Sequence, residues 1–225
     1  MLSMINPKAK AVIAIAGIAV VLIGAGLWYD GKRKDANLAA SAGVGYEQSE
    51  PTRPLRLSVI TDSDTSWPKL LAYGRGWYLN SEQTPGTGYV AGGSTSFTDK
   101  VAGATRTAPD VIVIAGGSND EFDSAAVPEQ ASRLYLDLMR LNPGAQILVV
   151  GPIVTSTNRA PNVRAVNDAV RSAAEGAGLQ FIDAQDWLSA PGLVEVSGQP
   201  TEEGDRVIAE SIAAALPGLP DEVPA

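Results

Sequence analysis

The chain has neither cysteine nor histidine among its 225 residues. The lack of cysteine excludes disulfides, thiol nucleophiles and cysteine-ligated metal sites. The lack of histidine removes the usual general base, the usual imidazole metal ligand and the side chain that titrates near neutral pH. We therefore expect no metal and no cofactor. Any proton transfer has to use a less common group.

Basic residues are scarce beyond the N-terminal segment. Residues 1–34 carry five Lys or Arg side chains and one Asp, a net charge of +4. The remaining residues carry 12 basic and 24 acidic side chains, a net charge of −12. An acidic body repels phosphate backbones, so we expect no nucleic-acid partner. Apolar residues make up 45% of the chain, enough for a sizeable core.

One run of 19 residues has no charge, and it predicts a transmembrane anchor at residues 11–29, after a short flank at 1–10. As a helix it is about 28 Å long, close to the thickness of the hydrocarbon layer. Trp28 and Tyr29 end it, where aromatic rings favour the headgroup zone. A cleaved signal peptide or a buried helix are the alternatives. Cations flank both ends, so the positive-inside rule leaves the orientation open.

Two segments without helical or strand periodicity flank the rest of the chain. Residues 30–54 are rich in Ala, Gly and Ser and predict a flexible tether. Residues 217–225 contain three prolines and two acidic residues, and they predict a frayed tail. One folded domain is therefore expected at residues 55–216.

Residues 55–216 alternate short β-branched runs with amphipathic helical patterns. The expected strands are 55–60, 110–115, 146–151 and 179–183, with a possible fifth at 88–91. Helices are expected from 66–68 onward, over 127–141 and 163–177, and over 201–216. This alternation favours a mostly parallel sheet with helices on both faces. Functional groups are then expected beyond the carboxyl ends of the strands.

Three segments at these expected strand ends carry candidate site residues. Ser63 follows the first strand, at a turn into a helix where backbone N–H groups could bind an oxyanion. Gly92-Gly93 follows residues 88–91, and Asn119 follows residues 110–115 with an amide suited to a developing negative charge. Each segment alone is equally typical of a helix cap or a turn.

Together, and in this order, the segments resemble the SGNH or GDSL hydrolase family. Asp62-Ser63 is similar to the centre of its GDS motif, Gly93 to its second-block glycine and Gly117–Asp120 to its GxND block. The resemblance implies a flavodoxin-like three-layer α/β/α fold and hydrolysis of acyl or acetyl esters on lipids or glycans. It makes Ser63 the nucleophile. The N–H groups of Ser63 and Gly93 and the Asn119 amide then form the oxyanion hole.

The last block departs from the family pattern. The position of the family's histidine holds Gln199, and that of its aspartate holds Val196. A glutamine side chain has no basic lone pair near neutral pH, so it cannot take the proton of Ser63. The nearby carboxylates, Glu195, Glu202, Glu203 and Asp205, are poor bases unless burial raises their pKa values. Asp64 adds a further negative charge beside Ser63.

Three interpretations follow. The first is a membrane-anchored pseudo-enzyme that binds an acyl or glycan group, or a protein partner of unspecified identity. The second is an esterase with a base other than histidine. The third is a structural component of the cell envelope. The resemblance favours an extracytoplasmic location for the domain.

Overall fold

The computed structural model describes residues 52–155 and 161–224, which belong to one compact unit. The predicted anchor at 11–29 and the predicted tether up to residue 51 lie outside the described residues. None of the helices in the described part of the chain is long and apolar enough to cross a membrane.

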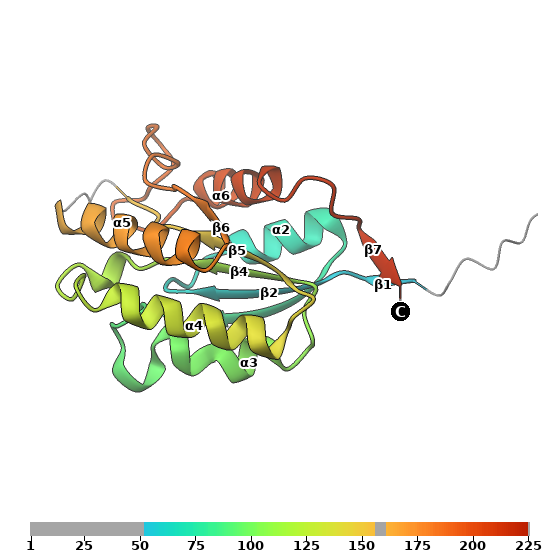
Figure 1. Ribbon diagram of the computed structural model, residues 1–225. Helices are drawn as coiled ribbons and strands as arrows, with labels where there is room; N and C mark the ends of the chain where they lie inside the picture. Colours follow the sequence, from blue (N-terminus) through green and yellow to red (C-terminus); the bar gives the residue numbers. More distant parts are fainter. Residues whose placement is uncertain (1–51, 156–160, 225) are drawn as a thin grey trace, which may run out of the picture. The chain divides into compact units, whose positions relative to one another are not determined.

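The core of the fold is a parallel sheet of five strands in the order β3-β2-β4-β5-β6 (Figure 1). The central strands pair in register, with Ile60 opposite Ile114 and Ile114 opposite Val149. The order changes direction at β2, as expected for a sheet wound in both directions from its centre. The predicted parallel sheet is thus confirmed. The strands are β2 (Arg56–Thr61), β3 (Tyr78–Gln83), β4 (Val111–Ala115), β5 (Gln146–Val150) and β6 (Gln180–Ile182).

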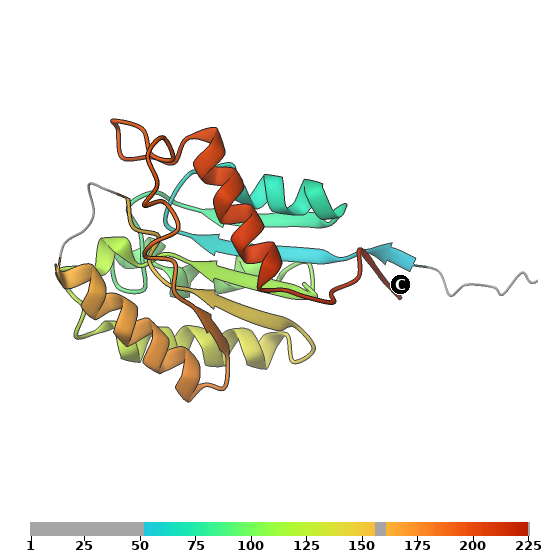
Figure 2. The same cartoon turned by 90° about the horizontal axis from the view of Figure 1, so that it is seen from above.

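Helices cover both faces of the sheet and make three layers. α2 (Trp67–Arg75) and α6 (Glu202–Ala214) lie side by side on one face (Figure 2). α3 (Val101–Thr105), α4 (Val127–Leu141) and α5 (Pro161–Gly176) cover the other face. Alternate residues of a strand point to opposite faces, so β4 divides between two cores: Val111 and Val113 pack under α2 and α6, Ile112 and Ile114 under α4 and α5.

The fifth strand lies at residues 78–83, and the prediction of a strand at 88–91 is wrong. β3 has the sequence YLNSEQ and is only partly buried. It is an edge strand that pairs with β2 alone, so four polar residues in a row are tolerated and no apolar run marks it. Residues 88–91 form turns and bends, and their backbone N–H groups bind a buried side chain described below.

The unit also extends beyond the predicted boundaries at 55 and 216. β1 (Thr52–Pro54) pairs antiparallel with β7 (Glu222–Pro224), so the end of the predicted tether and the predicted frayed tail form a two-stranded sheet. The Trp77 indole N–H donates to the carbonyl of Pro220 at 3.3 Å, and Leu219 and Val223 pack against the core. Prolines are tolerated here because each of these strands has a free edge.

Candidate active site

The carboxyl ends of β2, β3, β4 and β5 surround one cavity of about 280 Å³. The loop before α6 closes its remaining side. The lining residues come from five segments: Asp62 to Thr65 with Trp67, Pro85 and Gly86, Ser118 and Asn119, Ile153 and Thr155, and Gly198 to Pro200 with Ile208. A cavity thus lies beyond the strand ends, where the sequence led us to expect functional groups.

The structure brings together three of the five site residues expected from sequence. Ser63, Asn119 and Gln199 all line the cavity. Gly93 is not a lining residue: it begins the exposed 3-10 turn η1 (Gly93–Thr95). Val196 is fully exposed and also lies outside the cavity lining.

Gly86 lies in the cavity wall after β3, the strand that the sequence pattern did not mark. Its backbone N–H donates to the carbonyl of Asp62 at 3.2 Å. Gly86 has a φ of +78°, in the left-handed region that favours glycine, and a Cβ there would meet nothing within 4 Å. Had Tyr78–Gln83 been recognised as a strand, the turn Thr84-Pro85-Gly86 at its end would have pointed to this residue.

The turn that carries Ser63 is held by Gln83, the last residue of β3. The Gln83 amide donates to the carbonyl of Ser63 at 3.3 Å and to that of Thr65 at 2.9 Å. The Ser63 hydroxyl itself makes no hydrogen bond to any residue in the described ranges, and neither does the Gln199 side chain. Ser63 is therefore positioned through its backbone, and no residue of the ranges 52–155 and 161–224 accepts the proton of its hydroxyl.

Asp62 connects the first and third blocks. Its Oδ2 accepts from the N–H of Gly117 at 2.9 Å, from the N–H and hydroxyl of Ser118 at 3.2 Å each, and from Nδ2 of Asn119 at 3.4 Å. Burial raises the pKa of Asp62 to about 6, although the hydrogen bonds from Gly117 and Ser118 lower it. A Cβ on Gly116 would overlap this carboxyl group, so a glycine is required there.

The Asn119 amide is shared between two protein acceptors. Nδ2 donates to the carbonyl of Thr87 at 2.8 Å and makes the longer contact to Asp62. The first bond orients the amide, and the second hydrogen is the one available for the longer contact to Asp62. An oxygen bound in the cavity would compete with the Asp62 carboxylate for that hydrogen.

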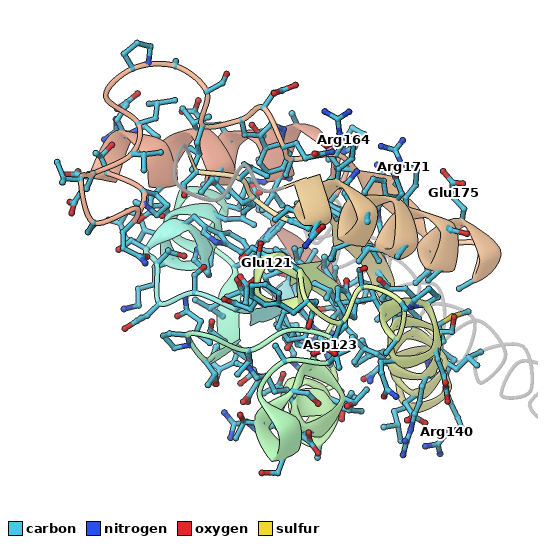
Figure 3. The ribbon with its side chains drawn as sticks, turned by 90° about the vertical axis from the view of Figure 1, so that its left-hand side faces the viewer. Glu121, Asp123, Arg140, Arg164, Arg171 and Glu175 are labelled. Atoms are coloured by element: carbon cyan, nitrogen blue, oxygen red, sulfur yellow. The ribbon has the colours of Figure 1, made fainter. Side chains whose placement is uncertain are left out.

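Asp120, next in sequence, is fully buried and organises residues 89–91. It accepts hydrogen bonds from the backbone N–H groups of Tyr89 at 2.8 Å, Val90 at 2.9 Å and Ala91 at 2.7 Å. Glu121 and Asp123, which follow it in the sequence, lie at the end of the molecule viewed in Figure 3. No group of acidic side chains in the described part of the chain is arranged to hold a metal ion.

Lys100 is a buried cation that the sequence pattern did not single out. Its Nζ donates to the hydroxyl of Thr87 at 3.1 Å and to the carbonyl of Thr61 at 3.4 Å. Burial lowers the pKa of Lys100, while the negative charges of Asp62 and Glu82 raise it. Lys100 therefore lies behind the cavity wall, in contact with Thr87, whose carbonyl orients the Asn119 amide.

The carboxylates considered as substitute bases lie away from the cavity lining. Glu195 accepts from the Ser197 hydroxyl, and Glu202 and Glu203 pair with Arg206 on the exposed side of α6. Asp205 accepts from the N–H of Ser66 at 2.9 Å, at the start of α2. Only Asp62 and Asp64 contribute carboxyl groups to the cavity among the described residues.

Several solved structures share this fold, and two of the three described here are esterases by title. The chain superposes on the crystal structure of TesA with a TM-score of 0.58 and 16% identity, over 72% of this chain and 98% of that one. For a carbohydrate esterase of family 3 from Talaromyces cellulolyticus the TM-score is 0.58 and the identity 18%, over 72% and 96%. For an acetyl xylan esterase, Est2A, from Butyrivibrio proteoclasticus the values are 0.54 and 14%, over 74% and 64%.

At these identities the structural matches establish the fold. No curated protein sequence matches the chain. The family model of the GDSL-like lipase/acylhydrolase family matches residues 41–207, which contain every segment of the cavity wall up to Pro200. Because that match spans well over half of the sequence, the chain belongs to the GDSL-like lipase/acylhydrolase family.

Proposed function

We propose that this protein binds an acyl or acetyl ester in the cavity beside Ser63 and turns it over very slowly or not at all. In this proposal the Ser63 hydroxyl and N–H and the Asn119 amide contact the ester, and Gly86 forms part of the cavity wall beside it. Gln199 occupies the position of the general base but cannot accept the proton of Ser63. The ester belongs to a lipid or a glycan.

One observation carries the proposal: the Ser63 hydroxyl has no basic partner among the described residues, and the sequence has no histidine to supply one. The segment 156–160, which borders Thr155, contains no carboxylate either. Loss of the base of a serine triad costs on the order of a million-fold in turnover. Donors to the oxyanion and binding alone retain about a thousand-fold or more over the reaction in water.

The charges around Ser63 also oppose catalysis. Asp62 and Asp64 both line the cavity, and an ionised carboxylate near a developing alkoxide or oxyanion destabilises it. A neutral ester or acetyl group carries no such charge in its ground state. The cavity is therefore better suited to hold a neutral acyl group than to stabilise an anionic transition state.

The shape of the cavity fits a small group. Its volume of about 280 Å³ is near the lower end of ligand pockets, and Trp67, Ile153 and Ile208 give it apolar walls. The Talaromyces enzyme named above is a carbohydrate esterase, and Est2A is an acetyl xylan esterase. These neighbours support an acetylated glycan as one source of the ester.

Turnover is tested with residues 51–225, the compact unit that contains both cores. We expect this protein to hydrolyse p-nitrophenyl acetate no faster than its Ser63→Ala variant. A fluorophosphonate probe should leave Ser63 unlabelled at neutral pH. Ser63-dependent hydrolysis or labelling would overturn the claim that turnover is lost.

Binding is tested by titrating ethyl butyrate into the same protein and following amide chemical shifts by NMR. Gly86→Trp should abolish the shifts by filling the cavity. Gly93→Trp is the matched control, since both glycines have a positive φ and open space at Cβ, and only Gly86 lines the cavity. Absence of binding to the unmodified protein would favour a structural envelope component with an unused cavity.

A second candidate is an esterase that uses a carboxylate as base. Asp62 favours it, because it is a lining residue of the cavity and burial raises its pKa to about 6. Against it, four donors already occupy Oδ2, and no hydrogen bond joins Asp62 to the Ser63 hydroxyl. This candidate predicts Ser63-dependent hydrolysis that rises with pH through about 6. If Asp62→Asn abolished this rise of activity with pH, Asp62 would be established as the base.

The proposal includes a membrane anchor at residues 11–29 and an extracytoplasmic domain. It rests on the 19 uncharged residues and their aromatic end. The full chain should stay in the membrane pellet after washing at alkaline pH, with its C-terminus accessible to protease from outside the cell. Release of a shorter protein beginning after residue 42 would instead indicate a cleaved signal peptide.

A further inference from the structure

A second groove lies at the opposite end of the sheet from the cavity. Its volume is about 550 Å³, and it is open to solvent along one side. The residues that line it come from the start of β2, the start of β3, the end of β1 and the loop before β4. They include Arg53, Arg56, Tyr78, Arg106, Thr107 and Ala108.

This groove is separate from the site of the proposed function. Arg56 is the first residue of β2 and Thr61 the last, and Tyr78 and Gln83 hold the same places in β3. Five strand steps span about 17 Å, so the length of the sheet lies between the two sites. Ligands of parallel sheets usually bind at the carboxyl ends, so nothing in the fold itself accounts for a basic groove at the amino ends.

The groove gathers three guanidinium groups in an otherwise acidic body. Arg53 is held by a two-pronged ion pair with Asp110, at 2.6 and 2.8 Å. Arg56 donates to the carbonyls of Thr107 at 3.1 Å and Ala108 at 3.5 Å, and no carboxylate of the described residues lies within 4 Å of its guanidinium. Asp110 thus neutralises Arg53, and Arg56 contributes a positive charge that no carboxylate pairs with directly.

Arg106 adds a second guanidinium that is available to a ligand. It donates to Oδ1 of Asn80 at 2.9 Å, and the nearest carboxylate oxygen, on Glu82, is 3.9 Å away. Its side chain is 66% exposed. Arg56 and Arg106 therefore both keep N–H groups free to donate into the groove.

The backbone of the groove is strained at one point. Ala108 has a φ of +47°, and it is the one non-glycine residue with a positive φ in the described ranges. Such a conformation costs on the order of 1 kcal/mol and is concentrated at binding and catalytic sites. It directs the carbonyls of Thr107 and Ala108 to Arg56, which sets the position of that guanidinium. The Thr107 hydroxyl is buried beside it without a partner among the described residues.

We propose that this groove binds a phosphate group, held by Arg56 and Arg106. A guanidinium presents paired N–H donors that match the oxygens of a phosphate group, and it keeps its positive charge at any pH at which the phosphate is ionised. The groove is larger than phosphate alone, and Tyr78, 57% exposed, provides an aromatic wall for the rest of the molecule. The ligand class is a phosphate ester, either a phospholipid headgroup or a soluble phosphate ester.

The test uses residues 51–225 and two matched double variants. Arg56→Gln with Arg106→Gln removes two charges from the groove. Arg133→Gln with Arg140→Gln removes two exposed charges from α4, outside the groove. Glycerol 1-phosphate is titrated in low salt and followed by NMR, with glycerol as the uncharged comparison.

We expect millimolar or tighter binding of glycerol 1-phosphate, weakened at least about tenfold in the groove variant and unchanged in the α4 variant. Equal weakening in both variants would mean general charge attraction and would overturn the proposal. So would the absence of binding at about 10 mM ligand. Circular dichroism with a thermal melt shows whether the variants are folded. Arg106→Gln alone is the fallback, because its exposed side chain has few structural contacts.

The source of the phosphate is decided by sedimentation with vesicles. Vesicles of phosphatidylcholine with phosphatidylglycerol, but not phosphatidylcholine alone, should pellet the protein in an Arg56- and Arg106-dependent way if the ligand is a headgroup. Binding of glycerol 1-phosphate without vesicle binding identifies a soluble phosphate ester. Both outcomes are independent of the ester-binding cavity, whose Gly86→Trp variant should leave phosphate binding unchanged.

Discussion

Ser63 and Gln199 line the same cavity, and no hydrogen bond joins the hydroxyl of the first to the amide of the second. Gln199 lies on the loop before α6, with its carbonyl bound to the N–H of Glu195 at 2.8 Å. The loop is thus ordered and brings a side chain to the cavity where the family has its base. In the function proposed above, the chemistry of the side chain at position 199, rather than the position of the loop, limits turnover.

Because residue 199 lines the cavity, Gln199→His should increase ester hydrolysis. We expect hydrolysis of p-nitrophenyl acetate by residues 51–225 to rise at least about tenfold over the unmodified protein, because an imidazole near Ser63 can accept its proton. The added hydrolysis should increase with pH through the ordinary pKa of histidine, about 6.5, because only the neutral imidazole can accept the proton. Gln199→Ala is the control and should show no gain.

Adding Val196→Asp to Gln199→His is expected to bring little more. The Val196 side chain is fully exposed and does not line the cavity, so a carboxylate there has to move before it can orient an imidazole. A folded Gln199→His protein that remains unlabelled by fluorophosphonate would show that more than the base is missing.

The buried carboxyl of Asp62 makes stability depend on pH. Its pKa is raised from 3.8 to about 6 in the folded protein, so the folded state binds more protons than the unfolded state between these values. Stability should therefore fall as the pH rises through this window, by up to about 3 kcal/mol. Urea denaturation at pH 4, 5, 6 and 7 measures it.

Asp62→Asn should flatten that part of the pH profile. Asp205, whose pKa burial also raises, stays in the variant, so the difference between the two proteins isolates Asp62. Identical slopes in the two proteins would contradict the assignment.

Lys100 should hold the Asp62 carboxyl in its ionised form. Its positive charge interacts with Asp62, so Lys100→Met should raise the pKa of Asp62 further. The 13C resonance of the Asp62 carboxyl, followed during a pH titration, measures this directly. Lys69→Met, an exposed lysine on α2, is the control and should leave the titration unchanged. An unshifted midpoint in Lys100→Met would show that the two charges are screened from each other.

Asp120 should be important for stability rather than for chemistry. Its carboxylate accepts three backbone N–H groups in a buried position, and Asp120→Asn puts an amide donor against at least one of them. We expect a loss of about 3 kcal/mol in the free energy of unfolding. Gly88→Ala should be similarly costly, because a Cβ there overlaps the same carboxylate.

Gly74→Ala is the matched control for that experiment. It changes a glycine within α2 whose Cβ would meet nothing within 4 Å, so it should be neutral or slightly stabilising. Denaturant unfolding of all three variants provides the comparison. A neutral Gly88→Ala would mean that residues 89–91 can move away from Asp120 at little cost.

The sequence by itself determined the family, the parallel sheet, and the presence of Ser63 and Asn119 at its carboxyl end. Apolar runs mark central strands because both faces are buried, and amphipathic stripes mark helices because only one face is. The absence of histidine also follows from the composition alone, so no arrangement of this chain can place an imidazole beside Ser63.

Only the tertiary structure decided which glycine lies in the cavity wall, that the C-terminal residues pair with β1, and that Arg53, Arg56 and Arg106 share a groove. β3 is an edge strand with one neighbour, so it tolerates polar residues and its sequence shows no apolar pattern typical of a strand. Because the strand could not be recognised from sequence, the place of Gly86 at its end could not be predicted either. Arg106 lies 50 residues after Arg56 in the sequence, and Lys100 lies 39 residues after Thr61, whose carbonyl it binds. Their proximity arises from the winding of the chain around the sheet, which local patterns do not encode.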